Sequence, residues 1–218
     1  MAMENNIEIR RLSPAPIEFR VESVEREDGG VDKYISGYGS VFEQNSLPIW
    51  GEIIEVISRG AFDDTDMSDV VMCVDHSRAV RDVLARSRNG EGSLEISVDE
   101  HGLKFRFLAP DTAAGRDIIT LVERGDIREC SFAFIVGSDK WTYDQRFGDE
   151  VYDVRRVERI SRLVDISIVV NGQYPQTSVG VDERAQMLSA REANRPKATP
   201  AEPEGMDVNF AKAITNIL

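Results

Sequence analysis

Short segments in which apolar and polar residues alternate, with turn residues between them, fill the chain from about residue 19 to residue 182. Alternation with a period of two is typical of strands that are buried on one face. The clearest case is residues 93–108, where the sequence DEHG links two alternating segments and predicts a β-hairpin. Many short strands and few helices predict a mainly β (α+β) fold. They favour a predominantly antiparallel β-barrel flanked by helices, with a β-sandwich as the alternative.

Two helices are expected to flank these strands. Residues 111–127 carry a helical apolar pattern, with Asp111 or Thr112 placed to cap the start and Gly125 placed to end the helix. A second, shorter helix is expected to begin within residues 58–65, SRGAFDDT.

The two ends of the chain differ in composition from the strand-rich region. Residues 1–18 are polar and are expected to form a flexible lead-in. Residues 19–183 are expected to form one domain, because a chain of this size can bury a single sizeable core. Residues 184–218 are expected to be a flexible linker, rich in proline and glutamate, that ends in a short helix with apolar residues at helical spacing.

The charge balance and the cysteine count argue against several classes of function. The chain has 26 basic and 39 acidic residues, a net charge of −13, which repels the phosphates of nucleic acids. No apolar run approaches the roughly 20 residues that a membrane-spanning helix needs, and the N-terminus lacks the apolar segment of a signal peptide. Two cysteines, Cys73 and Cys130, are too few for a disulfide framework or a typical zinc site. We therefore expect a protein of a reducing compartment, with the cytoplasm as the default, that uses no cofactor, metal, nucleic acid or membrane.

A serine interrupts the most apolar strand segment, residues 127–136, IRECSFAFIV. Alternation places Cys130, Phe132 and Phe134 on one face and Ser131 on the other. For an ordinary strand serine, a small polar residue on a solvated or tightly packed face is the simplest interpretation. The alternative is a nucleophile held on a rigid strand. Because Cys130 points away from the face of Ser131, the cysteine is expected to be a buried, inert thiol rather than the nucleophile.

A serine hydroxyl is a weak nucleophile and needs a histidine within hydrogen-bonding distance as its base. The chain has two histidines. His101 lies at the tip of the hairpin in residues 93–108, where a solvated turn residue is expected. His76 ends the apolar segment DVVMCVDH, where it is either a structural residue or the better of the two bases. Neighbouring strands can bring His76 and Ser131 together although they are 55 positions apart in the sequence.

A third residue should hold the imidazole in one tautomer and stabilise its charged form. Asp165, in the segment RLVDISIVV, is a carboxylate within an apolar strand, and such a group is costly to bury unless it is paired. Glu158 lies in the charged run RRVERISR and is expected to face solvent. Asp75 precedes His76 on the same strand, so its side chain should point to the opposite face. The residues therefore favour Asp165 as the third member.

Six segments, in this order, carry a resemblance to a known family. They are GYGSVF, RGAF, VDHS, HGLKFRF, DTAAGRDIITLVERGDIRECSFAF and LVDISIVVNGQYPQT. Together they resemble the prohead maturation proteases of HK97-like tailed phages, the caudovirus prohead serine protease family. The resemblance extends from about residue 19 to residue 182. Its most specific part is the helix, glycine and short link that lead into the strand with the Ser-Phe pair.

The resemblance implies a fold similar to that of the herpesvirus assemblins, a β-barrel surrounded by helices, and the activity of a serine endopeptidase. It places Ser131 at the family's nucleophile, His76 at its base and Asp165 at its acidic position. Two positions depart from the family's pattern. Ser77 follows the histidine in place of an acidic or amide residue, and aspartate stands where glutamate is common. The herpesvirus relatives use a second histidine as the third member, a role that would fall to His101.

The resemblance also implies partners and a location. Such a protease is packaged inside the assembling prohead, in the cytoplasm of the bacterial host. There it cleaves the scaffold segment of the major capsid protein and itself, and a homo-oligomer is expected. A backbone donor for the oxyanion is implied in a loop near Arg155 and Arg156. The alternative function is a non-catalytic capsid assembly module on the same barrel, which would not need His76 and Ser131 at the family's spacing.

Overall fold

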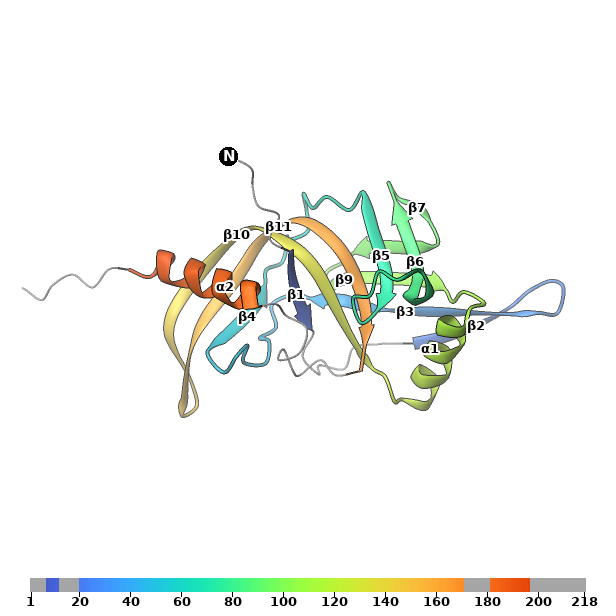
Figure 1. Cartoon of the computed structure of the whole chain (residues 1–218), viewed down its shortest axis with the longest axis horizontal. Helices are drawn as coiled ribbons and strands as arrows, with labels where there is room; N and C mark the ends of the chain where they lie inside the picture. Colours follow the sequence, from blue (N-terminus) through green and yellow to red (C-terminus); the bar gives the residue numbers. More distant parts are fainter. Residues whose placement is uncertain (1–6, 12–19, 171–180, 197–218) are drawn as a thin grey trace, which may run out of the picture.

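Two β-sheets form most of the computed structural model, which describes residues 7–11, 20–170 and 181–196 (Figure 1). The larger sheet has seven strands in the order β1-β10-β11-β5-β6-β7, with β4 paired to β11 outside this path. Its strands are β1 (Ile7–Arg11), β4 (Ile53–Ile57), β5 (Asp69–Val74), β6 (Val83–Arg88), β7 (Glu91–Gly92), β10 (Glu129–Phe147) and β11 (Glu150–Val169). The smaller sheet has the order β2-β3-β9-β8, and its strands are β2 (Arg20–Glu25), β3 (Val31–Val41), β8 (Leu94–Val98) and β9 (Gly102–Leu108). The prediction of a mainly β fold is confirmed.

The predicted hairpin in residues 93–108 is also confirmed, because β8 and β9 pair antiparallel across the turn that holds His101. The predicted closed antiparallel barrel is not what the described residues form. β11 runs parallel to both β4 and β5, so the larger sheet is mixed. The outer strands of its path, β1 and β7, pair with no common partner within the described segments, and the sheet therefore stays open.

The hairpin β10–β11 is the longest element of the larger sheet, with strands of 19 and 20 residues. Both strands curve across the molecule (Figure 1), and the pairing between them shifts register at several β-bulges, which bend a strand locally. The apolar side chains of β10 belong to one core cluster with those of β9 in the smaller sheet. Phe132 and Phe134 on β10, and Phe105 and Phe107 on β9, are all at most 1% exposed.

The predicted helix within residues 111–127 is present as α1 (Ala113–Arg124). Thr112 caps its start, since the threonine hydroxyl accepts a hydrogen bond from the backbone N–H of Gly115 at 3.2 Å. Gly125 ends the helix with a φ of 79°, in the left-handed region where glycine is favoured. The short link after Gly125 leads directly into β10.

The prediction of a second helix beginning within residues 58–65 is wrong. This segment forms successive turns in which an N–H group bonds a carbonyl three residues earlier, as between Ala61 and Ser58. Gly60 has a φ of 87°, which is incompatible with a continuous right-handed helix. A short 3₁₀ helix, η1 (Val80–Asp82), lies between β5 and β6 instead.

A helix also forms where the sequence predicted a flexible linker beginning at residue 184. This helix, α2 (Val181–Asn194), buries Met187 to 3% exposure. The Arg191 guanidinium pairs with Asp153 at 2.5 Å and with Glu52 at 2.8 Å. These contacts join α2 to β11 and to the turn before β4. The folded part of the chain therefore continues past residue 183, the predicted boundary. No helix in the described part of the chain is long and apolar enough to cross a membrane.

The N-terminal prediction needs a correction as well. Residues 7–11 lie within the segment expected to be a flexible lead-in, yet they form β1, which pairs antiparallel with β10 over five positions. The sequence pattern missed this strand because five residues, three of them charged, are too short and too polar to show alternation. The predicted short helix at the C-terminus lies outside the described residues and stays a prediction.

Candidate active site

Ser131 lies on β10, between β1 on one side and β11 on the other. Its register partners are Arg11 on β1 and Ser167 on β11. The side chain of Ser131 is fully buried. Its neighbours in the chain, Cys130 and Phe132, are also buried and belong to the hydrophobic core. Ser131 is therefore held by paired strands on both sides, as expected of a residue whose position must be fixed accurately.

His76 lies just beyond the end of β5, where the chain turns. Asp75 and His76 have φ angles of 48° and 57°, in the left-handed region, which Asp and His adopt more readily than most residues. The backbone N–H of Asp75 donates to the carbonyl of Ile168 on β11 at 3.1 Å, which anchors this corner to the neighbouring strand. The corner directs the imidazole toward β10, where His76 Nε2 lies 2.7 Å from Ser131 Oγ.

Asp165 completes a line of three side chains. It lies on β11, is 3% exposed, and places Oδ1 at 2.7 Å from His76 Nδ1. A carboxylate accepts only, so Nδ1–H donates to Asp165 and Nε2 is left to accept the proton of Ser131. The guanidinium of Arg78, which is largely exposed, lies 3.7 Å from the other carboxylate oxygen. The structure thus brings together the three residues that the sequence singled out.

Ser167 is a fourth residue of the site, to which the sequence analysis gave no role. Its buried hydroxyl accepts a hydrogen bond from the backbone N–H of His76 at 2.9 Å and donates to Asp165 at 3.4 Å. Cys73 Sγ lies 3.0 Å from the same hydroxyl oxygen. Ser167 therefore positions both the backbone that carries the imidazole and the carboxylate that orients it. The available signal was its place two residues after Asp165, on the same face of an apolar strand.

The other candidates lie elsewhere. Glu158 pairs with Lys140 at 2.5 Å on the exposed side of the hairpin, and His101 lies in the turn of the smaller sheet. Arg155 and Arg156, expected near a loop that supplies an oxyanion donor, are both within β11, which corrects that expectation. Among the described residues, no group of three or more His, Cys, Asp and Glu side chains is arranged to hold a metal ion.

Neither cysteine is set up as a nucleophile. Burial raises the pKa of the Cys73 thiol to about 12, and the negative charge of Asp165 adds to the effect. Burial likewise raises the pKa of Cys130, which is fully enclosed in the core. Both groups are neutral thiols at physiological pH, and Cys73 can donate its S–H to Ser167.

Resistance to alkylation is the expected consequence. At pH 8, the native chain should gain no mass from iodoacetamide over an hour, because almost no thiolate forms below a pKa of about 12. The chain unfolded in denaturant should gain two adducts, which serves as the control; intact-mass spectrometry measures both. Fast labelling of Cys130 alone in the native chain, with loss of activity, would contradict this conclusion and indicate that the Cys130 thiol is the nucleophile.

A serine, a histidine and an aspartate in hydrogen-bonded sequence form the arrangement used by serine hydrolases on several unrelated folds. Because this arrangement does not identify a family by itself, we compared the sequence with known protein families. Residues 18–191 match the family described as caudovirus prohead serine protease. The chain belongs to the caudovirus prohead serine protease family. Membership assigns protease activity to the chain in general terms, and the family match contains every strand except β1.

Among solved structures, the bacteriophage T4 capsid assembly protease, gp21, is similar to this chain with a TM-score of 0.40 and 12% sequence identity. The similarity covers 75% of this chain and 99% of that chain. A search of curated proteins finds no match. Membership in the prohead protease family therefore rests on the sequence match.

Proposed function

We propose that the protein is a serine endopeptidase that cleaves the scaffold segment of the major capsid protein, and itself, inside the assembling phage prohead. In this proposal, Ser131 is the nucleophile, His76 the general base and Asp165 the residue that orients and stabilises the imidazole. The observation that carries it is the position of His76, whose two ring nitrogens lie 2.7 Å from Ser131 Oγ and 2.7 Å from Asp165 Oδ1. Family membership supports the same reading.

The geometry suits acyl transfer. Ser131 Oγ attacks the carbonyl carbon of the scissile peptide while its proton moves to His76 Nε2. The imidazolium then gives that proton to the leaving amine, the C–N bond breaks, and an ester on Ser131 remains. Water, deprotonated by the same nitrogen, hydrolyses the ester. Asp165 keeps its charge throughout and stabilises the imidazolium, while Ser167 holds the carboxylate and the histidine backbone in place.

Co-expression with the major capsid protein of the same phage tests the proposal. The wild-type chain should shorten the capsid protein by its scaffold segment, as measured by intact-mass spectrometry. His76→Ala should abolish the cut, because the serine loses its base. His101→Ala is the matched control, since it removes the other histidine from an exposed turn and should leave the cut unchanged.

A capsid protein that assembles with the chain but stays uncut in every sample would favour the non-catalytic assembly module instead. A cut that survives His76→Ala and disappears in His101→Ala would show that His101, and not His76, is the base. The two outcomes are separable because assembly is followed by particle size, and cleavage by mass.

A further inference from the structure

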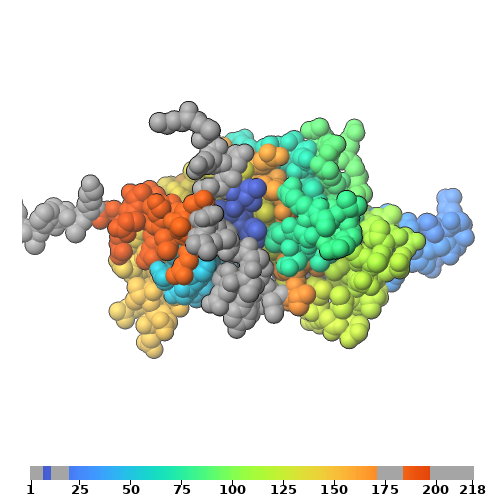
Figure 2. All heavy atoms as spheres, in the orientation of Figure 1, coloured from blue at the N-terminus to red at the C-terminus, as the bar shows by residue number. Residues whose placement is uncertain are grey.

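The strand β1 lies along the nucleophile strand and covers the reactive serine. Its register places Arg11 opposite Ser131 and Arg10 opposite Phe132. The Ser131 hydroxyl lies 2.9 Å from the carbonyl oxygen of Arg10, and the serine side chain is fully buried. In Figure 2 the residues of β1 (blue-violet) lie at the surface of the molecule, beside the residues that follow β5. A peptide group of the chain itself therefore occupies the position in front of the proposed nucleophile.

The hydroxyl of Ser131 has one proton and two neighbouring acceptors, His76 Nε2 and the carbonyl oxygen of Arg10. When the proton goes to His76, as in the proposed mechanism, an oxygen lone pair of Ser131 is left facing the carbonyl group of Arg10. The carbonyl carbon bonded to that oxygen is the atom that Ser131 would attack, and the Arg10–Arg11 bond is the bond that would then break.

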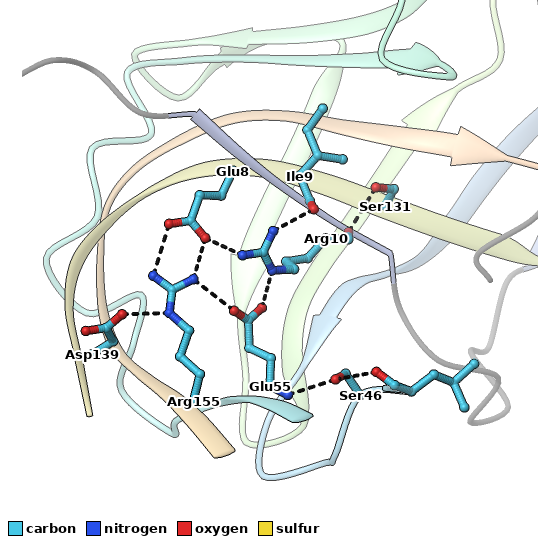
Figure 3. Close-up of polar contacts among 9 residues, drawn as sticks. Glu8, Ile9, Arg10, Ser46, Glu55, Ser131, Asp139 and Arg155 are labelled. Carbon is cyan, nitrogen blue, oxygen red and sulfur yellow. Dashed lines mark hydrogen bonds and ion pairs between the residues drawn. The ribbon is translucent and has the colours of Figure 1, made fainter. Parts of the chain in front are cut away.

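The side chain of Arg10 has a built binding site. Only 8% of the residue is exposed, and its Nε donates to Glu55 Oε1 at 2.5 Å (Figure 3). Its guanidinium lies 5.7 Å from the centre of the Phe134 ring. Glu55 is on β4, is 4% exposed, and its backbone N–H is fixed by the hydroxyl of Ser46 at 2.8 Å. A buried carboxylate that meets a guanidinium in this way selects arginine over any uncharged side chain.

Glu8 is bound in the same manner, two residues earlier on the same face of β1. Arg155 on β11 donates to its two carboxylate oxygens at 2.5 and 3.0 Å, and also to Glu55 at 3.1 Å and Asp139 at 2.6 Å (Figure 3). Glu8 also pairs with Arg10 within β1. An extended segment with glutamate and arginine two positions apart therefore fits this surface at both side chains.

The charges of the two sides complement each other. The body of the protein contributes two carboxylates, Glu55 and Asp139, and one guanidinium, Arg155. From β1, the Glu8 carboxylate and the Arg10 guanidinium meet them. Burial raises the pKa of Glu8, but the adjacent guanidinium groups outweigh this effect and hold its pKa below the ordinary value. Burial lowers the pKa of Arg155, and the surrounding carboxylates more than reverse that. Glu8 and Arg155 are therefore charged, and each needs its partner because an unpaired buried charge is costly.

We infer that β1 occupies the substrate groove as an internally bound peptide, and that the groove selects the sequence Glu-x-Arg and directs cleavage after the arginine. Glu55 recognises the arginine before the scissile bond, and Arg155 recognises the glutamate two residues earlier. A substrate strand would add to the edge of β10, a common mode of peptide recognition. The inference rests on the proposed function, and it makes the Arg10–Arg11 bond a self-cleavage site.

The step balances without any further reactant except water. Ser131 Oγ bonds to the carbonyl carbon of Arg10, the C–N bond to Arg11 breaks, and His76 passes the serine proton to the new α-amine of Arg11. Water then hydrolyses the ester. Residues 1–10 are released with a free carboxylate at Arg10, and the groove becomes open to other substrates.

Self-cleavage is tested by the intact mass of the full chain during incubation after purification. The wild-type chain should lose the mass of residues 1–10 and show Arg11 as its new N-terminus. The Arg10→Gln chain should lose this mass more slowly by a factor on the order of 100, because Glu55 loses the guanidinium of Arg10 and keeps only its contact with Arg155. Arg20→Gln, a change of the same kind at the start of β2, should cleave at the wild-type rate.

Selectivity is tested in trans with synthetic peptides and the full-length enzyme. The reference peptide has the sequence of residues 5–14, NNIEIRRLSP; in a second peptide glutamine replaces the arginine at position 10, and in a third the glutamate and arginine are exchanged. The wild-type enzyme should prefer the reference peptide to the other two by a factor on the order of 100 in kcat/KM. Glu55→Gln should reduce the preference over the glutamine peptide at least tenfold, because the carboxylate that pairs with the arginine is lost. Glu52→Gln, at a partly exposed glutamate of the adjacent turn that pairs with Arg184 and not with Arg10, should retain the full preference.

The peptides need no variant enzyme, so a Glu55→Gln chain that fails to fold leaves the test intact. Capsid protein cut in a His76-dependent manner, together with an uncut Arg10–Arg11 bond and equal rates on the three peptides, would overturn this inference and leave the proposed function standing. In that case β1 would be a permanent structural strand. No cleavage of capsid protein or of any peptide would overturn both.

Discussion

Replacing Ser131 by alanine is expected to lower kcat for cleavage of the capsid protein by a factor on the order of 10⁶, as for the loss of a serine nucleophile that acts as a unit with its base. A low residual rate should remain, because substrate binding and oxyanion stabilisation persist. The fold should survive, since losing one buried hydroxyl with its hydrogen bonds costs about 1 kcal/mol of unfolding free energy. Single-turnover cleavage and thermal unfolding of the same preparation measure the two effects.

Ser40→Ala is the matched control for this variant. Ser40 lies on β3, is fully buried like Ser131, and its hydroxyl has no hydrogen-bond partner within the described residues. Removing an unsatisfied buried hydroxyl should leave both stability and kcat near the wild-type values. A Ser131→Ala enzyme that cleaves as fast as Ser40→Ala would end the assignment of Ser131 as the nucleophile.

Asp165→Asn is expected to lower kcat by a factor on the order of 10⁴ while the chain remains folded. The amide can donate to His76 Nδ1, and this favours the tautomer whose Nε2 carries the hydrogen. That nitrogen can then no longer accept the proton of Ser131, 2.7 Å away. The loss should appear in kcat at every pH at which the wild-type enzyme is active, because the geometry is kept and only the tautomer changes.

Asp153→Asn makes the same chemical change twelve positions earlier on the same strand. Asp153 is also 3% exposed, but it pairs with Arg191 of α2 rather than with a histidine. It should therefore lower the temperature of unfolding and leave kcat unchanged, the reverse of the Asp165→Asn pattern. A near-normal rate for Asp165→Asn would show that another group holds the imidazole, and Glu158 and His101 would then be tested in the same way.

Ser131 and the residues around it could be predicted from the sequence because their positions follow from local rules. Strand alternation separates Ser131 from Cys130, and an apolar strand that ends in His76 or contains Asp165 is unusual enough to be noticed. The helix before β10 was likewise marked by its own cap, Thr112, and by its terminal glycine. Each of these signals lies within a few residues of the position that it predicts.

What the sequence did not reveal depends on pairing between distant segments. Glu8, Glu55 and Arg155 each look like ordinary charged residues, and only the pairing of β1 with β10 and of β4 with β11 makes them one buried group. The same holds for the open, mixed sheet, for which the pattern favoured a predominantly antiparallel β-barrel, with a β-sandwich as the alternative. Alternation reveals that a strand is buried on one face, but it contains no information on which strand lies beside it.

β1 is the edge strand of the larger sheet, so a shortened chain without it would expose the edge of β10. A version that starts at residue 18, where the family match begins, lacks β1 and bares the backbone N–H and C=O groups of residues 131–135. An uncovered apolar strand edge is a template for other copies of the chain, so such a version should be less soluble than the full-length protein and form oligomers that grow with concentration. Light scattering at rising protein concentration should show this growth, and adding a peptide with the sequence of β1 should suppress it. Solubility and an accessible catalytic groove would then be competing demands on the same strip of backbone.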